Sequence, residues 1–334
     1  MTDEAGWRRS AYDGPGSPYR DAPAPREDGP SYRTLTYEVD GRVARLVFNR
    51  PEQGNSITPD TPVELADAVE RADLDPRVHV IVLSGRGKGF CGGYDLAASA
   101  ERILDGGMVG SAPQEGTVLD PTVQMHNHDP AGTWDPMVDY AMMSRFTRGF
   151  ASLLHANKPT VASIHGFCVA GGTDIALHCD QIVIAADAKI GYPPTRVWGV
   201  PSAGLWAHRL GDQRAKRLLF TGDCLSGREA AEWGLAIEAP EPEDLEERTE
   251  NLVQRIAAMP LNQLMMVKLA LNSALLAQGV ENSRMISTVF DGVSRHTREG
   301  YAFQQRAAEA GFRQAVRERD AAPYDDFGPS TNKG

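Results

Sequence analysis

Two glycine-rich turns constrain the fold of this chain more than any other feature of its sequence. Each follows an apolar run typical of a buried strand: the first turn is Phe90–Asp95 and the second is Ala170–Asp174. Because glycine has no Cβ, backbone built from it can approach a ligand closely and point its N–H groups at the ligand. Two such turns lying side by side could each direct one N–H group at the same oxygen. The sequence therefore predicts a shared pocket that stabilises negative charge on an oxygen.

The apolar patterns predict an α/β protein with a mostly parallel sheet. Residues 34–39 and 43–48 alternate around Asp40-Gly41, which is typical of a β-hairpin. A helix is expected at 62–72, and strands at 78–83, 160–165 and 181–186. Short apolar strands separated by helices favour parallel pairing. From residue 204 onward the pattern is helical, with helices expected at 210–220, 227–233, 242–258, 261–278 and 281–319.

Composition divides the chain into a core and extensions. Residues 1–33 are rich in Pro, Gly, Arg and Asp without periodicity, so we expect a disordered leader. The core is expected at 34–225, a C-terminal helical region at 226–320 and a flexible tail at 321–334. Within the core, the segment at about 104–139 follows the first turn and is rich in Gly, Pro and Asp. We interpret it as a lid-like insertion over the pocket.

Composition also excludes several classes of function. The net charge of -11 and the absence of a basic cluster argue against binding to nucleic acid. No apolar stretch is long enough to span a membrane, so a cytoplasmic protein is expected. The four cysteines lack zinc or redox spacing, and we interpret His126 and His128 as solvated loop residues because no carboxylate or thiol stands at matching spacing. No metal and no redox cofactor is predicted.

The order of several motifs resembles the crotonase superfamily, the enoyl-CoA hydratase/isomerase group, over residues 34–315. The resemblance rests on Phe48-Asn49-Arg50-Pro51 with Asn55, on Gly89-Phe90-Cys91-Gly92-Gly93-Tyr94-Asp95-Leu96, on 158–162 leading through His165-Gly166 to Gly171-Gly172, on Cys179-Asp180, and on Ile190-Gly191-Tyr192-Pro193. It implies a crotonase-like spiral of β-β-α turns with a C-terminal helical trimerisation region. The expected partners are an acyl-CoA substrate and further copies of the chain, in a trimer or a dimer of trimers.

The resemblance assigns the catalytic groups. The backbone N–H groups of Tyr94 and Gly171 stand where the family forms the oxyanion hole that stabilises a thioester enolate. Asp174 stands where hydratases carry their first catalytic glutamate, which makes it the candidate acid/base. An acidic residue in the first turn of a helix can instead stabilise only the helix end, and we favour the catalytic interpretation over that one. Coenzyme A is part of the substrate, and no separate cofactor is implied.

The resemblance also implies binding residues, some of which have a plain structural alternative. Tyr192, Pro194 and Arg196 are expected near the acyl group, or else they pack a loop between subunits. Arg306 is expected to supply positive charge to the nucleotide, or else it lies on a solvated helix face. The full set implied for substrate and CoA is Arg50, Asn55, Cys91, Gly93, Asp95, Leu96, Tyr192, Pro194, Arg196, Phe303 and Arg306.

One departure from the family bears directly on the reaction. Hydratases place a second glutamate after Gly-x-Pro, but here Gly191-Tyr192-Pro193 is followed by Pro194, and residues 190–211 contain no acidic side chain. With one carboxylate, double-bond isomerisation is easier to defend than hydration. Three alternatives stay open: another crotonase reaction such as thioester hydrolysis or decarboxylation, a degraded enzyme that only binds acyl-CoA, and a hydrolase built on Ser202 and His208.

Overall fold

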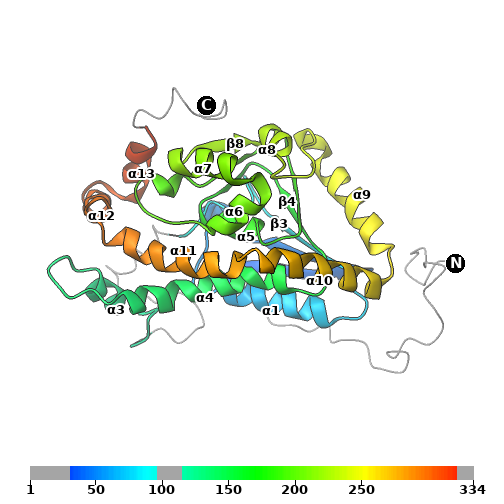
Figure 1. The fold of residues 1–334 in the computed structure, drawn as a ribbon, viewed down its shortest axis with the longest axis horizontal. Coiled ribbons are helices and arrows are strands. Elements are labelled where there is room, and N and C mark those ends of the chain that lie inside the picture. The colour runs from blue at the N-terminus through cyan, green and yellow to red at the C-terminus, as the bar shows by residue number, and fades with distance from the viewer. Residues whose placement is uncertain (1–30, 96–114, 322–334) are drawn as a thin grey trace.

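The computed structural model of the chain describes residues 31–95 and 115–321 (Figure 1). Most of the predicted leader (1–30), Leu96, the start of the predicted insertion (104–114) and the tail at 322–334 lie outside the described residues. The last residues assigned to the leader contact the first long helix. The Tyr32 hydroxyl donates to Asp67 at 2.6 Å and the Arg33 amide donates to Glu64 at 2.8 Å. The residues just ahead of the first strand are therefore anchored on α1 (Thr61–Leu74).

The central layer is a five-stranded sheet with strand order β1-β2-β3-β4-β6. Strand β1 (Leu35–Asp40) pairs antiparallel with β2 (Val43–Phe48), and β2, β3 (Val80–Gly85), β4 (Thr160–Ile164) and β6 (Gln181–Ile184) pair in parallel. A second sheet joins β5 (Phe167–Val169) in parallel to β7 (Lys189–Gly191), which pairs antiparallel with β8 (Cys224–Ser226). The predicted mostly parallel α/β fold is confirmed. The continuous apolar run of β3 is typical of a strand that is buried on both faces.

Long helices cover one face of the sheets (Figure 1). In Figure 1, α11 (Val280–Arg295) and α10 (Leu261–Ala277) follow one another end to end, and α4 (Pro136–His155) and α1 (Thr61–Leu74) run alongside this row, below β3 and β4 in the view. Helix α4 packs between α1 and α11, and α11 also packs against α6 (Ala203–Leu210). Among the helices that the structure describes, none is long and apolar enough to cross a membrane. The shorter elements are α5 (Gly171–Ala176), α7 (Asp212–Thr221), α8 (Gly227–Trp233), α9 (Leu245–Ala257), η1 (Pro51–Gln53), η2 (Pro193–Arg196) and η3 (Pro242–Asp244).

The described part of the predicted lid, residues 115–139, includes helical segments. It contains α3 (Pro121–Asn127) and the first turn of α4. Both helices begin at an Asp-Pro pair: Asp120 accepts a hydrogen bond from the Thr122 amide at 2.8 Å, and Asp135 accepts one from the Met137 amide at 2.9 Å. An aspartate cap followed by proline in the first turn is a helix-start signal. Here the same residues had been interpreted as loop composition.

The C-terminal region also differs from the expected single helix at 281–319. It consists of α11, α12 (Arg298–Ala310) and α13 (Phe312–Ala321). Helix α12 begins where the Thr297 hydroxyl accepts a hydrogen bond from the Gly300 amide at 3.0 Å, and it ends at Gly311. The break after Arg295 sets the C-terminal end of α11, whose residues Ser287, Thr288 and Asp291 line a cavity.

Large apolar side chains are exposed on α10 and α11. A helix that is apolar on several sides was expected to be covered on several sides, yet in the chain by itself α10 fully buries only Lys268. We call this surface the α10–α11 apolar face. Its members are Met266, Val267, Leu269, Leu271, Met285, Ile286, Val289 and Phe290.

Candidate functional site

The structure brings the two glycine-rich turns into contact. The backbones at Cys91 and Cys168 pair as an isolated parallel β-bridge, and the Val169 amide donates to the Cys91 carbonyl at 3.0 Å. Both cysteines are free thiols. The approach is so close that a Cβ added at Gly93 would lie 2.7 Å from the Ala170 Cβ and 3.4 Å from the Gly171 nitrogen. Gly93 also has a φ of +95°, which favours glycine. The two turns therefore form one continuous wall.

The backbone N–H groups of Tyr94 and Gly171 are left without a backbone acceptor. Ile57 donates to the Gly93 carbonyl at 2.8 Å and accepts from the Asp95 amide at 2.9 Å. Because successive N–H groups of an extended chain alternate in direction, the Tyr94 N–H faces away from Ile57. Gly171 is the first residue of α5, where N–H groups have no intrahelical partner. Within residues 31–95 and 115–321, neither group donates a hydrogen bond to another segment.

Asp174 lies beside these amides, buried in the first turn of α5 and 4% exposed. One carboxylate oxygen accepts a hydrogen bond from the Ser202 amide at 2.8 Å. Burial raises the pKa of this carboxyl to about 7, although the Ser202 amide partly opposes the shift. Within the described residues, the Asp174 carboxylate accepts its hydrogen bond from the Ser202 amide and not from an N–H group of α5. Asp174 is thus positioned by a loop that faces α5.

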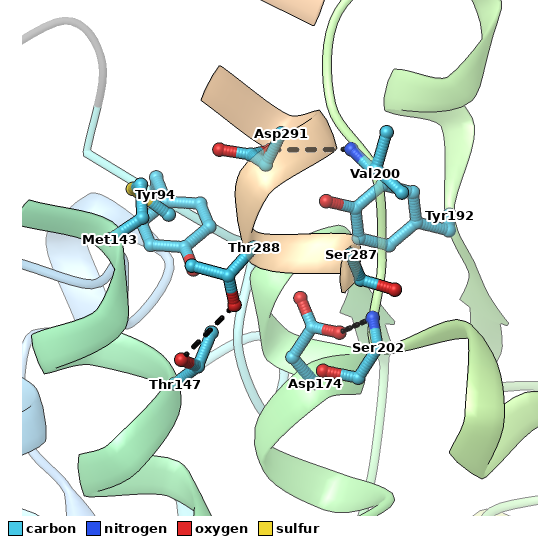
Figure 2. A pocket seen from close by; sticks show the side chains of 10 residues that line it. All are labelled: Tyr94, Met143, Thr147, Asp174, Tyr192, Val200, Ser202, Ser287, Thr288 and Asp291. Carbon is cyan, nitrogen blue, oxygen red and sulfur yellow. Dashed lines mark hydrogen bonds between the residues drawn. The ribbon is translucent and has the colours of Figure 1, made fainter. Parts of the chain in front are cut away.

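A small cavity lies over Asp174 (Figure 2). Its volume is about 10 Å³, about the room that one water molecule needs. We call the two turns with α5 the floor of the cavity, and α11 its roof. The side chains that line it are Tyr94, Met143, Thr147, Asp174, Tyr192, Val200, Ser202, Ser287, Thr288 and Asp291.

Two buried tyrosines flank the cavity. Figure 2 shows Tyr94 and Tyr192 on opposite sides of it. Burial raises the pKa of both phenols well above the usual value, so both keep their hydroxyl protons at neutral pH. The Tyr94 ring packs edge-on against Phe146 with ring centres 5.5 Å apart, and this contact fixes its orientation. The cavity thus has two apolar ring walls, each with a hydroxyl.

A second carboxylate lines the cavity, and the sequence analysis missed it. Asp291 on α11 is 13% exposed and lies 3.3 Å from the Arg295 guanidinium. Burial raises the pKa of its carboxyl above the usual value, while Arg295 opposes that shift. An Asp and an Arg four residues apart are also typical of a surface ion pair on a helix. The spacing therefore does not distinguish this aspartate from a solvated one. The lining residues Met143, Thr147, Ser287 and Thr288 were not predicted either.

Several residues implied for CoA surround the first turn and brace it. The Arg50 guanidinium pairs with Asp95 at 2.8 Å. The Asn55 amide donates to the Gly89 carbonyl at 2.9 Å. Cys91 is fully buried beneath the turn. These contacts hold the turn in its conformation, and contact with CoA stays a prediction for this group.

Four other implied residues lie outside the cavity lining. Pro194 lies in η2, and Arg196 beside it donates to the Thr221 carbonyl at 3.0 Å and pairs with Asp223 at 3.5 Å. Phe303 packs against Trp198 with ring centres 5.5 Å apart. Arg306 is exposed and donates to Glu318 at 2.6 and 2.7 Å. Their roles in binding substrate stay predictions.

The histidines do not form a metal site or a serine–histidine pair. His126 is exposed, whereas the ring of His128 stacks on His296 with centres 4.5 Å apart. His208 pairs with Gln278 at 3.2 Å, on the exposed side of α6 rather than at Ser202. Among the residues that the structure describes, no three His, Cys, Asp or Glu side chains are placed to hold a metal ion.

The chain is similar to several known proteins over most of its length. The family model described as "Enoyl-CoA hydratase/isomerase" matches residues 38–112 and 136–309. The chain is 30% identical over 287 residues to the (E)-benzylidenesuccinyl-CoA hydratase of Thauera aromatica, covering 83% of this chain and 98% of that protein. It is 28% identical over 239 residues to the 1,2-epoxyphenylacetyl-CoA isomerase of Escherichia coli (strain K12), covering 71% and 80%. A crystal structure of an enoyl-CoA hydratase from Mycobacterium smegmatis superposes with a TM-score of 0.80 at 68% identity, covering 86% and 93%.

Proposed function

The chain belongs to the enoyl-CoA hydratase/isomerase family, and we propose that it moves a proton on the acyl group of an acyl-CoA thioester. The Tyr94 and Gly171 amides hold the enolate that forms, and Asp174 is the acid/base. One observation carries this proposal: two N–H groups without a backbone acceptor lie on two adjoining turns, and Tyr94 and Asp174 of those turns line one cavity.

The two amides suit the charge that the reaction creates. Removing a proton next to a thioester carbonyl moves an electron pair onto the carbonyl oxygen and forms an enolate. Fixed N–H donors stabilise that charge without having to reorganise, and one such donor contributes a factor of about 10²–10³ in rate. Tyr94 and Gly171 lie on turns held together by the backbone β-bridge between Cys91 and Cys168, so their positions are set before substrate binds.

Asp174 suits proton transfer between carbon atoms. A pKa of about 7 lets the same group accept and return a proton near neutral pH. In isomerisation, Asp174 takes a proton from one carbon, the double bond shifts through the enolate, and Asp174 returns the proton to another carbon. This sequence needs no water and no second carboxylate, and it is the reaction that Asp174 can perform alone. Relatives named as a hydratase and as an isomerase both occur among the similar proteins.

The test is turnover by the full-length protein on a panel of acyl-CoA substrates, with products identified by mass. We expect Asp174→Asn to lower kcat by about 10²–10⁴ while acyl-CoA still binds. Asp187→Asn is the matched control, because Asp187 is exposed and lies away from the cavity. Unchanged turnover in Asp174→Asn would remove Asp174 from the mechanism. Binding without any turnover in the wild type would favour the degraded-enzyme alternative, and release of free CoA would favour hydrolysis.

The α10–α11 apolar face supports a homo-oligomer as part of the same proposal. Soluble monomers rarely expose a contiguous apolar patch of this kind. Eight large apolar side chains are exposed on these two consecutive helices, which run end to end (Figure 1). We propose that further copies of the chain cover this face, in a trimer or a dimer of trimers.

A further inference from the structure

The roof of the cavity carries a carboxylate opposite Asp174. We propose that Asp291 is the second proton-handling group of this site, taking the role of the carboxylate that the chain lacks at Pro194. The proposal rests on the proposed function, because it needs the enolate and Asp174 as described above. It restores hydration of an enoyl-CoA to the chemistry that the site can perform.

One short loop holds both carboxylates in place. The Val200 amide donates to Asp291 at 3.2 Å, and the Ser202 amide donates to Asp174 at 2.8 Å. Pro201 between them has no N–H group and so competes for neither oxygen. Figure 2 shows the two carboxylates on opposite sides of the cavity, each with its hydrogen bond to this loop. The loop therefore fixes the distance between two acidic groups that approach the cavity from α5 and α11.

The charges around Asp291 differ from those around Asp174. Arg295 lies 3.3 Å from Asp291 and 3.3 Å from Asp139, so one cation lies between two carboxylates. Asp139 has further partners of its own: Asn127, Trp134 and His296 donate to it at 3.1, 2.7 and 3.0 Å. Asp139 is thus satisfied within its network and does not line the cavity. Asp291 has the Val200 amide and Arg295, and it faces the cavity.

This difference assigns the two roles. Burial raises the pKa of both carboxyl groups, but the Arg295 guanidinium opposes the shift at Asp291, whereas only hydrogen bonds from Ser202 oppose it at Asp174. A carboxyl group beside a cation suits the role of base, and a buried one without a cation suits the role of acid. The groups facing Asp291 that bear on its charge are Arg295, Asp139, Asp174 and the neutral phenols of Tyr94 and Tyr192.

The hydration step balances with these two groups. Asp291 takes a proton from water as the water oxygen forms a bond to Cβ of the enoyl group. The electron pair of the C=C bond moves toward the thioester oxygen and forms the enolate, which the Tyr94 and Gly171 amides hold. Asp174 then gives its proton to Cα, and the C=O bond forms again. Water has been added across the double bond, and both carboxyl groups recover their protonation states by exchange with solvent.

The test separates two reactions in one set of full-length variants. The first is hydration of crotonyl-CoA or cinnamoyl-CoA, followed by product mass, and the second is exchange of the Cα hydrogens of butyryl-CoA in heavy water. Exchange requires the enolate and Asp174, but it does not require activation of water. We expect Asp291→Asn to lower hydration by about 10²–10⁴ while exchange changes less than about tenfold. Asp291→Glu keeps the charge beside Arg295 but displaces the carboxylate, and it should show the same selective loss.

Asp139→Asn is the matched control, because Asp139 contacts the same Arg295 but does not line the cavity. It should leave the ratio of hydration to exchange unchanged. The proposal is overturned if Asp291→Asn lowers both reactions alike or neither, if Asp291→Glu hydrates at the wild-type rate, or if Asp139→Asn gives the same selective loss.

Failure of the proposed function would look different. In that case the wild type would show neither exchange nor turnover, or Asp174→Asn would retain both reactions, and the Asp291 proposal would fall with it. A wild type that exchanges or isomerises but hydrates neither enoyl-CoA would overturn the Asp291 proposal and leave the proposed function standing.

Discussion

The floor and the roof of the cavity are built in opposite ways. The floor is backbone: two glycine-rich turns meet so closely that side chains at Gly93 and Gly171 would collide with Ala170 and Tyr94. The roof is one face of a helix, and it contributes Ser287, Thr288 and Asp291. Glycine patterns are local in the sequence, so the floor can be read from a few neighbouring residues. The roof depends on how a distant helix packs.

Helix α11, the roof of the cavity, also places its polar and apolar side chains on the opposite sides from an ordinary surface helix. Polar Ser287, Thr288 and Asp291 point into the molecule, whereas Ile286, Val289 and Phe290 of the same helix are exposed. The usual expectation places the apolar stripe toward the core and the polar face toward solvent. Applied to α11, that expectation assigns Asp291 to solvent. A covered outer face explains the reversal, and it is the reason that we propose an oligomer.

The largest effect is expected from a single methyl group on the floor. In Gly93→Ala the new Cβ would lie 2.7 Å from the Ala170 Cβ, on backbone with φ of +95°, and would push the two turns apart. Because this displaces one or both enolate donors, kcat should fall by about 10²–10³ or more. Gly92→Ala is the neighbouring control, since its Cβ would meet only ordinary contacts at 3.4 and 3.5 Å. Steady-state kinetics and melting temperatures of the two variants provide the comparison. Similar kcat values for both would show that activity does not depend on the close approach of the two glycine-rich turns.

The next effect concerns the pH dependence of stability. The folded protein raises the pKa of Asp174 from 3.8 to about 7, so between these values it holds a proton that the unfolded chain releases. Stability from this group is therefore fully present below about pH 4 and is lost as the pH rises through about 7. At about 1.4 kcal/mol per unit, the loss amounts to at most about 4 kcal/mol. Asp174→Asn should lack this component, and denaturant unfolding across pH 4–8 measures the difference. Parallel pH profiles for wild type and variant would show that the carboxyl is not the isolated acid described here.

The smallest effect on activity is expected from the outer side of the roof. Phe290→Glu places a charge on the α10–α11 apolar face and should weaken the oligomer, because each buried aromatic side chain contributes about 1.5–3 kcal/mol. Activity should fall less than tenfold, since Phe290 does not line the cavity. Phe220→Glu is the control: Phe220 is more exposed, at 81%, but lies on α7. Light scattering after size exclusion gives the masses. A monomeric wild type, or equal masses for both variants and the wild type, would exclude this face as the subunit contact.

Local patterns predicted much of the fold. The strand at 43–48 and the helix at 227–233 have the predicted bounds, because the first is a mostly apolar run that follows the Asp40-Gly41 turn and the second begins at a capping box formed by Ser226 and Glu229. No helix was predicted for residues 136–155, which form α4. Its start at Asp135-Pro136 was taken for loop composition, and its inward face mixes Thr147 with apolar residues. The breaks at Thr297 and Gly311 were missed because the helical pattern continues through them.

The residues on or beside the glycine-rich turns could be predicted to lie together, whereas the positions of the charged side chains depend on which partners they pair with in the fold. Tyr94, Asp174 and Tyr192 line one cavity, and Gly171 lies against Tyr94. The charged residues behaved differently. Arg196 pairs with Asp223, a partner 27 residues away. Sequence spacing does not indicate whether an arginine will pair with a distant carboxylate or contact a ligand. The position of Asp291 likewise follows from the packing of α11 on α4 and α6.

Neighbouring positions of α11 belong to different surfaces. Thr288 and Asp291 line the cavity, and Val289 and Phe290 between them are exposed. A helix cannot rotate one of these faces without moving the other, since both are fixed on the same 3.6-residue turn. During divergence of related enzymes, a shift or rotation of this stretch that reshapes the cavity would therefore also move the outer surface. Selection on the cavity and selection on the outer surface would thus act on interleaved codons of one helix.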